Sequence, residues 1–495
     1  MELQFQNKEM PCLRQLSNQV LNQEQTLEVR LDDSKPEVGR VLGAWGQPVL
    51  RGKEWHSSGV QVSGGVMAWV LYLPEDGGPC CSVEAWLPFQ WKTDIPPAQN
   101  DGTVIADCVL RSIDARSLSG KKLMVRANAS LQMQVLVPDR ATLWEPEGLP
   151  EDVQLKQESC QVLLPAEAGE KPFVIDELLQ PPADFQKLLR YSLQPELSEQ
   201  KIMADKVVFR GVGLAHILYL GDDDRVHAWN PEMPFAQYAP LGGQYGEDAD
   251  GQIRLAVTSL DLTPVENGGL HLNAGLTGQY LIVEPRQLQL VTDAYSTQML
   301  ARPHFEELEL PVVQGLDRQK LSCQMNLEIK AKSIVDGVFL PECPMCSVTD
   351  TGVCLEMAGV CQILYYNEEG ELAAASGSWS EETEFPMVGD CRIQARVVPN
   401  GLVRTSCDGG SVLVQAEAGV DTLGLASQPL RTIGALELTE CEREADRPSL
   451  ILRRAGKESL WDMAKATGST VDAIMEANSL EGEPAPERFL LIPVS

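Results

Sequence analysis

The sequence predicts a mainly β protein, with three repeated β-sandwich-like or open-barrel domains followed by a small βααβ module. A block of sequence recurs three times without a gap, in Gln47–Leu73, Gln194–Leu220 and Leu340–Tyr366. Segments rich in valine and threonine are bounded by Gly, Pro and Asp at short intervals, which is typical of β-sandwiches and barrels. Helical periodicity is nearly absent before residue 450.

The spacing of the three blocks indicates whole domains. Their period is about 146 residues, far longer than a solenoid repeat, so each copy is expected to fold as a domain. The blocks share a proline column and end on a Leu-Tyr pair. We therefore predict that Tyr72, Tyr219 and Tyr365 lie on equivalent strands.

The segments after each block predict further strands. Each block is followed by an acidic turn, in Pro74–Gly78, Gly221–Asp224 and Asn367–Gly370, which predicts a hairpin tip. Further along, every second residue of Val125–Val137 is apolar. This period of two predicts a strand with one buried face. The exceptions to the β pattern are Gln180–Arg190 and Lys35–Leu42, where a short helix or turn is expected before the block.

Polar, proline-bearing stretches suggest where the domains end. Leu149–Gln157 and Ala166–Pro172 predict a first linker, and the charged run Glu440–Pro448 predicts a second. The predicted division is an N-terminal segment at 1–25, β domains at 26–150, 172–300 and 310–440, and the βααβ module at 448–495.

Composition argues against several classes of partner. The formal charge is −31, which disfavours nucleic acid and anionic lipid and suits a cationic partner. No segment reaches the roughly 18 apolar residues that a membrane-spanning helix needs, so no membrane insertion is expected. The N-terminal residues lack the basic-then-apolar order of a secretion signal. These features, with an odd number of cysteines (13), predict a cytoplasmic protein without a disulfide framework.

Signals for catalysis or metal binding are weak. Cys343 and Cys346, followed by Cys354 and Cys361, resemble a zinc spacing. The equivalent positions in the other blocks are mostly small or apolar, which favours structural cysteines that pack as small hydrophobes. The five histidines share no column, and no nucleophile elbow, P-loop or HExxH motif occurs. We therefore predict no catalytic residues, no metal and no cofactor, although a metal or redox site at the cysteines remains an alternative.

The last residues predict the βααβ module element by element. Leu450–Arg454 and Phe489–Pro493 are the expected strands. Ser459 can cap a first helix that ends at Gly468, and Ser469 can open a second. The residues expected to face the core are Leu460, Trp461, Ala464, Val471, Ile474 and Met475. Trp461 is the largest of these.

This module resembles the LysM domain, whose pattern is S/T-L-W-x-x-A-K, T-V-x-x-I-x-x-x-N and a final L-x-I-P. Behind repeated β domains it resembles the SPOCS architecture of clostridial spore-envelope proteins. The resemblance implies a non-enzymatic scaffold or adaptor in the mother-cell cytoplasm, at the forespore surface. It also implies that the LysM tail docks a protein partner, such as a coat ATPase similar to SpoIVA.

The alternative implied by the LysM resemblance is binding of peptidoglycan or chitin-type glycans. LysM domains bind glycans with the loop before the first helix and the loop before the last strand. Here Lys457-Glu458-Ser459 replaces the usual G-D-T, and Ala485–Arg488 replaces Y-P-G-Q, so a flexible glycine is missing near the sugar. For partner or glycan, the predicted binding residues are Lys457, Glu458, Ser459, Asp462, Lys465, Asn478, Leu480 and Arg488.

Overall fold

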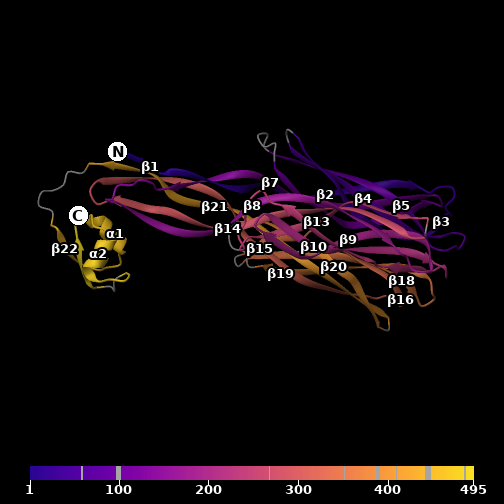
Figure 1. The fold of residues 1–495 in the computed structure, drawn as a ribbon. Helices are drawn as coiled ribbons and strands as arrows, with labels where there is room; N and C mark the ends of the chain where they lie inside the picture. Colours follow the sequence, from indigo (N-terminus) through magenta and orange to yellow (C-terminus); the bar gives the residue numbers. More distant parts are fainter. Residues whose placement is uncertain are drawn as a thin grey trace.

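The computed structural model describes the chain except residues 57–58, 96–101, 267, 350–351, 386–390, 409, 441–447, 484–486 and 495. The chain is mainly β and elongated, with a thick head, a narrower stalk and a small helical module at the far end of the stalk (Figure 1). The N-terminus lies beside that module. Neither of the two described helices is long and apolar enough to cross a membrane.

The strands of head and stalk follow one order three times, and we call the three successive groups units 1, 2 and 3. Unit 1 contains β2 (Gln6–Arg30), β3 (Val38–His56), β4 (Gly59–Pro74), β5 (Cys81–Asp94), β6 (Thr103–Ser119) and β7 (Lys122–Glu145). Unit 2 contains β8 (Val153–Leu179), β9 (Phe185–Met203), β10 (Lys206–Gly221), β11 (Val226–Trp229), β12 (Glu232–Pro240), β13 (Asp250–Pro264) and β14 (Leu270–Ser296). Unit 3 contains β15 (Leu300–Leu327), β16 (Ala331–Pro341), β17 (Met345–Val348), β18 (Val353–Asn367), β19 (Leu372–Phe385), β20 (Arg392–Asp408) and β21 (Ser411–Thr439). The short strand β1 (Glu2–Gln4) pairs with β21.

Each unit is built from two antiparallel sheets. In unit 1 the orders are β3-β4-β5 and β2-β7-β6, and units 2 and 3 follow the same scheme around β10 and β14 and around β18 and β21. The sheets stay open, and the described strands form no closed barrel. Tyr72, Tyr219 and Tyr365 lie on the central strands β4, β10 and β18, as predicted. The acidic turns connect paired strands, which confirms the predicted hairpins.

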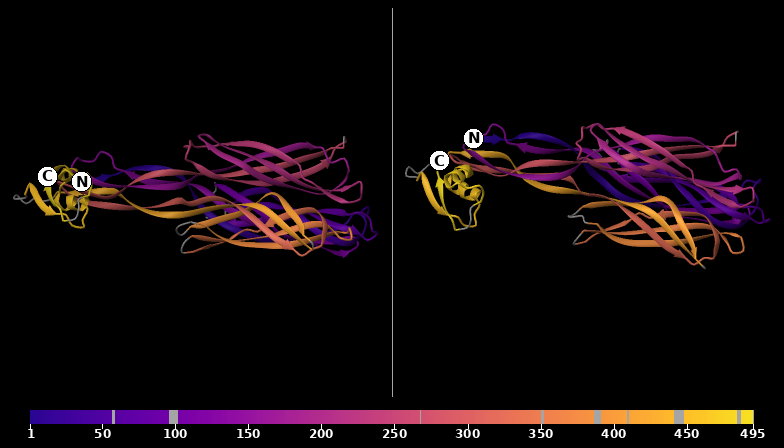
Figure 2. Two further views of the ribbon diagram at one scale, coloured as in Figure 1. Left: turned by 90° about the horizontal axis from the view of Figure 1, so that it is seen from below. Right: turned by 60° about the horizontal axis from the view of Figure 1, so that its bottom comes forward.

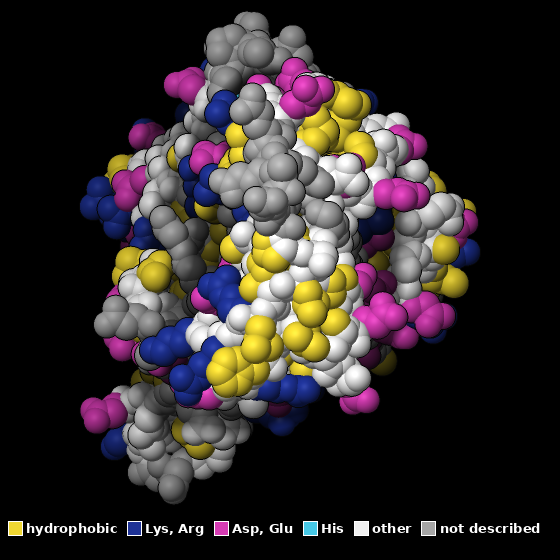
Figure 3. All heavy atoms as spheres, turned by 90° about the vertical axis from the view of Figure 1, so that its left-hand side faces the viewer, with side chains coloured by type: hydrophobic (Ala, Val, Ile, Leu, Met, Phe, Trp, Pro, Cys, Tyr) yellow, Lys and Arg dark blue, Asp and Glu magenta, His cyan; other side chains and the backbone are white. Residues whose placement is uncertain are grey.

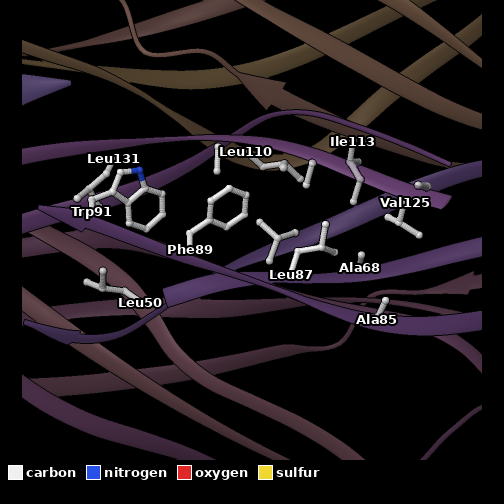
Figure 4. Close-up of a cluster of buried hydrophobic side chains, with 14 of the residues drawn as sticks. Leu50, Ala68, Ala85, Leu87, Phe89, Trp91, Leu110, Ile113, Val125 and Leu131 are labelled. Carbon is white, nitrogen blue, oxygen red and sulfur yellow. The ribbon is translucent and has the colours of Figure 1, made fainter. Parts of the chain in front are cut away.

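The core of each unit lies between its two sheets. In unit 1, Leu87 and Phe89 of β5 face Leu131 of β7 and Leu110 of β6 (Figure 4). Leu87 and Leu131 are completely buried. Similar apolar cores fill units 2 and 3, because alternate residues of every central strand point inward.

The stalk is formed by the long hairpins β2/β7, β8/β14 and β15/β21, which continue beyond the head and run side by side (Figure 2). Each contributes apolar side chains to the packing between hairpins. Cys12, Leu288 and Leu310 meet in one cluster, and Trp144, Val291 and Ile433 meet in another nearer the module.

The three units meet in a central interface, which we define by the buried cluster around Leu71, Leu218 and Leu364. Every unit turns a β-bulge toward this cluster, because Leu42, Leu189 and Val335 are skipped in the strand register. No helix forms at Lys35–Leu42 or at Gln180–Arg190, so the helix alternative of that prediction is wrong. The turn alternative is confirmed at Ala183–Asp184, where the Phe185 amide donates to the Pro182 carbonyl just before β9. The bulges explain the helix-like pattern. A bulge places two consecutive apolar residues where a regular strand would bury one, and the resulting apolar pair imitates a helical pattern.

Two predicted boundaries are also wrong. Residues 1–25 are not a separate segment, since β2 pairs with β7 along its whole length. The linker expected at Leu149–Gln157 and Ala166–Pro172 is largely strand β8, which pairs with β14. Polar residues are common there because a stalk hairpin leaves one face in water. The linker predicted at 440–448 falls mostly outside the described residues.

Candidate functional site

The module at the end of the stalk has the predicted order of strand, helix, helix and strand: β22 (Leu450–Arg454), α1 (Leu460–Thr467), α2 (Val471–Asn478) and β23 (Phe489–Pro493). Ser459 caps α1, and Gly468 ends it in the left-handed conformation with φ of 64°. The N-cap of α2 is Thr470 rather than the predicted Ser469, which is buried. The two short helices fit a LysM-like tail.

The core of the module is small and is completed by the stalk. Leu460, Met463, Ala464 and Ile474 pack against β23, and Tyr295 of β14 joins the same cluster. Trp461, which was predicted to face the core, is only partly buried and packs at the edge of this cluster. Its ring lies against Tyr295, edge to face with centroids 4.9 Å apart.

Polar contacts fix α1 on the stalk. Trp461 Nε1 donates to Asp293 Oδ2 at 2.8 Å, and Lys465 Nζ lies 2.7 Å from both oxygens of Asp293. The Tyr295 hydroxyl donates to the Ser469 carbonyl at 2.8 Å. We call Asp293, Tyr295, Trp461, Lys465 and Ser469 the stalk contact. It joins one face of α1 to unit 2.

The electrostatics of the stalk contact follow from its partial burial. Burial by itself raises the pKa of Asp293, but hydrogen bonds from Lys465 and Trp461 outweigh it and hold the pKa below its usual range. The carboxylate is therefore charged at neutral pH, and its contribution to stability is lost only as the pH falls through this lowered pKa. Burial raises the pKa of Tyr295 to about 12, so its hydroxyl keeps its proton and remains a donor.

The predicted residues of the first loop serve local structure. Ser459 and Asp462 form a capping box, in which the Asp462 amide donates to Ser459 Oγ at 3.2 Å. Hydrogen bonds from Ser459 lower the pKa of Asp462. Glu458 pairs with Arg453 at 2.7 Å, and Lys457 is exposed. Lys465, predicted as a binding residue, belongs to the stalk contact.

The second loop is tied to the first. Asn478 Nδ2 donates to the Leu491 carbonyl at 2.6 Å, while Asn478 Oδ1 accepts from the Leu491 amide at 2.7 Å. Arg488 donates to the Asn478 carbonyl, and the partly buried Leu480 packs on the core. The Glu483 carboxylate accepts from the Leu460 amide at 3.1 Å, so it occupies the first amide of α1.

The structure exposes an apolar surface that the sequence analysis did not single out. The outer face of the β22–β23 sheet carries Leu450, Leu452, Phe489 and Leu491, and Leu452 and Phe489 are each 64% exposed. We call these four residues the outer sheet face. Hydrophobic side chains are visible at this end of the molecule (Figure 3). Alternation along the strands was the available signal, since Ile451, Leu490 and Ile492 face the helices and leave their neighbours outside.

The head contains a second group of functional-type side chains, at the central interface. Arg190 of unit 2 and Asp336 of unit 3 form a buried ion pair at 2.6 Å, with side-chain exposures of 2% and 6%. Arg396 lies 3.1 Å from Asp107 in a polar layer that also contains Arg254 and Asp421. Burial first, and then the charge of Arg396, lowers the pKa of Arg254 to about 10. These groups join units and show no arrangement of nucleophile and base.

A pocket of about 200 Å³ borders this layer and is lined by all three units. His216 forms part of its wall, and burial lowers the pKa of His216 to about 4. Elsewhere, Cys361 is completely buried in unit 3, and burial raises the pKa of Cys343 to about 12. Among the described residues, no three His, Cys, Asp or Glu side chains are placed to hold a metal ion.

Comparison with known proteins adds no identification. No protein-family model, curated protein or solved structure matches this chain.

Proposed function

We propose that this chain is a non-enzymatic scaffold or adaptor, which docks a protein partner through its LysM-like tail in the manner implied for SPOCS-containing spore-envelope proteins. A coat ATPase similar to SpoIVA is the partner that this resemblance suggests, in the mother-cell cytoplasm. The observation that carries the proposal is the placement of the module at the end of a long stalk, attached by α1 and open on its outer sheet face.

The stalk contact supports an adaptor role because it gives the module a fixed orientation. An ion pair, two further hydrogen bonds and an aromatic contact join α1 to β14. A module held by a flexible tether alone would present every face. Here α1 is turned toward the stalk, so a partner would approach the outer sheet face or the loops.

The alternative, binding of peptidoglycan or chitin-type glycans, has less support from the loops. A sugar lying between them would need free backbone amides and close van der Waals contact. The Leu460 amide is already bonded to Glu483, and Glu458 and Glu483 are both exposed carboxylates at this point. The exposed side chain of Lys457 stands where the usual LysM pattern has glycine.

The proposal can be tested by comparing the full chain with a chain that ends at residue 440. Both are tagged, expressed in a spore-forming bacterium that contains the coat ATPase, and scored for recruitment to the forespore and for co-purification of the coat ATPase. We expect both signals to require the tail. Retention of both by the shortened chain would contradict the proposal.

A second measurement separates partner from glycan. The full chain and the Lys457→Gly variant, which restores the usual glycine, are incubated with insoluble peptidoglycan at physiological salt. We expect no retention of the full chain, and any gain to be confined to Lys457→Gly. Strong retention of the unmodified chain, together with unchanged localisation in cells lacking the coat ATPase, would favour the glycan function.

A further inference from the structure

The outer sheet face borders a strand edge that has no hydrogen-bond partner among the described residues. Val494 donates to the Ser449 carbonyl, and Ala455 donates to the Arg488 carbonyl, at the two ends of the β22–β23 pair. Because bonded pairs alternate in an antiparallel ladder, Ile451 and Arg453 face β23 with their backbone groups. The amides and carbonyls of Leu450, Leu452 and Arg454 therefore point away from β23.

No described residue bonds these outward backbone groups. The sheet contains β22 and β23 alone, and no hydrogen bond from the described part of the chain reaches the backbone of Leu450 or Leu452. An unpaired edge of this kind is a template for another strand. Natural proteins usually cover such edges or shorten them.

The opposite edge of the same sheet is closed. Asn478 uses its side-chain amide to bond both the amide and the carbonyl of Leu491, at 2.7 and 2.6 Å. Pro493 at the end of β23 has no backbone N–H that could donate to another strand. The module therefore blocks the edge of β23 at Leu491, whereas no described residue covers the edge of β22.

The size of the outer sheet face decides what kind of partner suits it. Four exposed side chains cover far less than the roughly 800 Å² per partner of a standard stable interface. Flat packing on this face would be weak, so backbone hydrogen bonds from the edge must supply much of the affinity. A second copy of this chain is disfavoured because each copy carries a formal charge of −31.

We propose that β22 is a strand-addition site, at which an extended segment of a protein partner pairs with Leu450–Arg454 and places every second, apolar side chain beside Leu450 and Leu452. The segment is neutral or basic overall, because the chain is strongly acidic. This inference rests on the proposed function, since it states how the partner docks on the tail.

The first measurement is hydrogen–deuterium exchange on the full chain. The amides of Leu450, Leu452 and Arg454 should exchange fast, whereas those of Ile451 and Arg453 should be protected. The probe is a capped nine-residue peptide that alternates valine and threonine and has a lysine at each end. Its addition should protect the three outward amides. The proposal would be overturned if the three outward amides still exchanged fast in the presence of the peptide. It would also be overturned if these amides were already protected in the free chain.

The second measurement compares three full-length variants in a peptide-binding titration. Leu452→Pro removes one outward amide at an edge position where proline is tolerated, and the preceding Ile451 is already extended. We expect it to weaken peptide binding at least about tenfold. Leu452→Ala and Leu491→Ala keep that amide while reducing the same apolar face, and should weaken binding about two- to threefold.

The outcomes separate this inference from the proposed function. Equal weakening by Leu452→Pro and Leu452→Ala would show that the side chain, not the edge, binds the peptide. Light scattering that finds two chains per particle would assign the edge to a second copy, and would overturn the proposal. If Leu452→Pro still recruits the coat ATPase while the chain ending at 440 does not, strand addition fails and the proposed function stands.

Discussion

The interior of each unit and the central interface are built from opposite faces of the same strands, and they differ in chemistry. Along β7, Leu131 and Met133 point into the apolar core of unit 1. Their neighbours Gln132 and Gln134 point the other way, yet they are only 2% and 1% exposed. Gln132 donates to the Ala395 carbonyl of unit 3 at 2.7 Å. Both faces of the strand are buried, one in an apolar core and one against another unit.

This difference suggests that the unit cores and the central interface serve different purposes. The unit cores use interchangeable apolar residues, whereas equivalent positions at the central interface carry different ones. Gly43, Arg190 and Asp336 lie opposite the buried leucines Leu71, Leu218 and Leu364 in the three units. Only one arrangement of the units pairs Arg190 with Asp336, so the polar groups favour a unique assembly.

The largest effect is expected when the buried ion pair is broken. Asp336→Ala leaves the Arg190 guanidinium buried without its carboxylate, which should cost about 3–5 kcal/mol of unfolding free energy. Urea unfolding of the full chain measures this loss. The double variant Arg190→Leu/Asp336→Ala also removes the unpaired buried charge and should recover most of the lost unfolding free energy. A double variant no more stable than Asp336→Ala would contradict this explanation.

A comparison of neighbouring residues on β7 should give the next largest effect. Leu131→Ala opens a cavity in a completely buried site and should cost about 2–5 kcal/mol. Gln132→Ala leaves the Ala395 carbonyl without its donor and should cost about 1–3 kcal/mol. Both values come from urea midpoints. If the two substitutions were equally harmless, the second face of β7 would not be packed as described.

His216 should make the central interface sensitive to acid. Its pKa is lowered to about 4 in the folded chain, against about 6.5 in the unfolded chain, so the unfolded state binds the proton first. Stability from the neutral ring is complete above pH 6.5 and is lost as the pH falls toward 4, by about 3 kcal/mol. His216→Gln should lack this component, and the difference between the two stability–pH profiles measures it. Parallel profiles would exclude the effect.

The smallest effect is expected at the stalk contact. Trp461→Ala should cost about 1–3 kcal/mol, chiefly by releasing the module from β14, because Leu460, Met463 and Ile474 still form its core. Small-angle scattering should then show a wider range of module positions. Asp293→Asn, which removes the ion pair and keeps the volume, should show a milder form of the same change. Complete unfolding of the module by Trp461→Ala would contradict this expectation and would show that the module core depends on Trp461.

Short sequence patterns were sufficient to predict the local features of this chain. The alternation of apolar residues predicted β7, the acidic turns predicted the hairpins, and Ser459 and Gly468 predicted the ends of α1. These predictions were possible because each signal depends on only a few neighbouring residues. The LysM-like order of strands and helices was predicted for the same reason. The function implied by the resemblance remains a proposal.

The contacts between strands of different units could be read only from the folded chain. In a sequence pattern, polar residues such as Gln132 and Arg190 indicate a face that is exposed to solvent. In the structure both are buried, because another unit supplies their hydrogen-bond partners. Lys465 was expected to bind a partner and is paired with Asp293 of the stalk, and Trp461 packs against Tyr295 of the stalk as well as against the module core. Contacts between residues more than a hundred positions apart leave no local pattern, so only the folded chain shows which polar face meets water and which meets another strand.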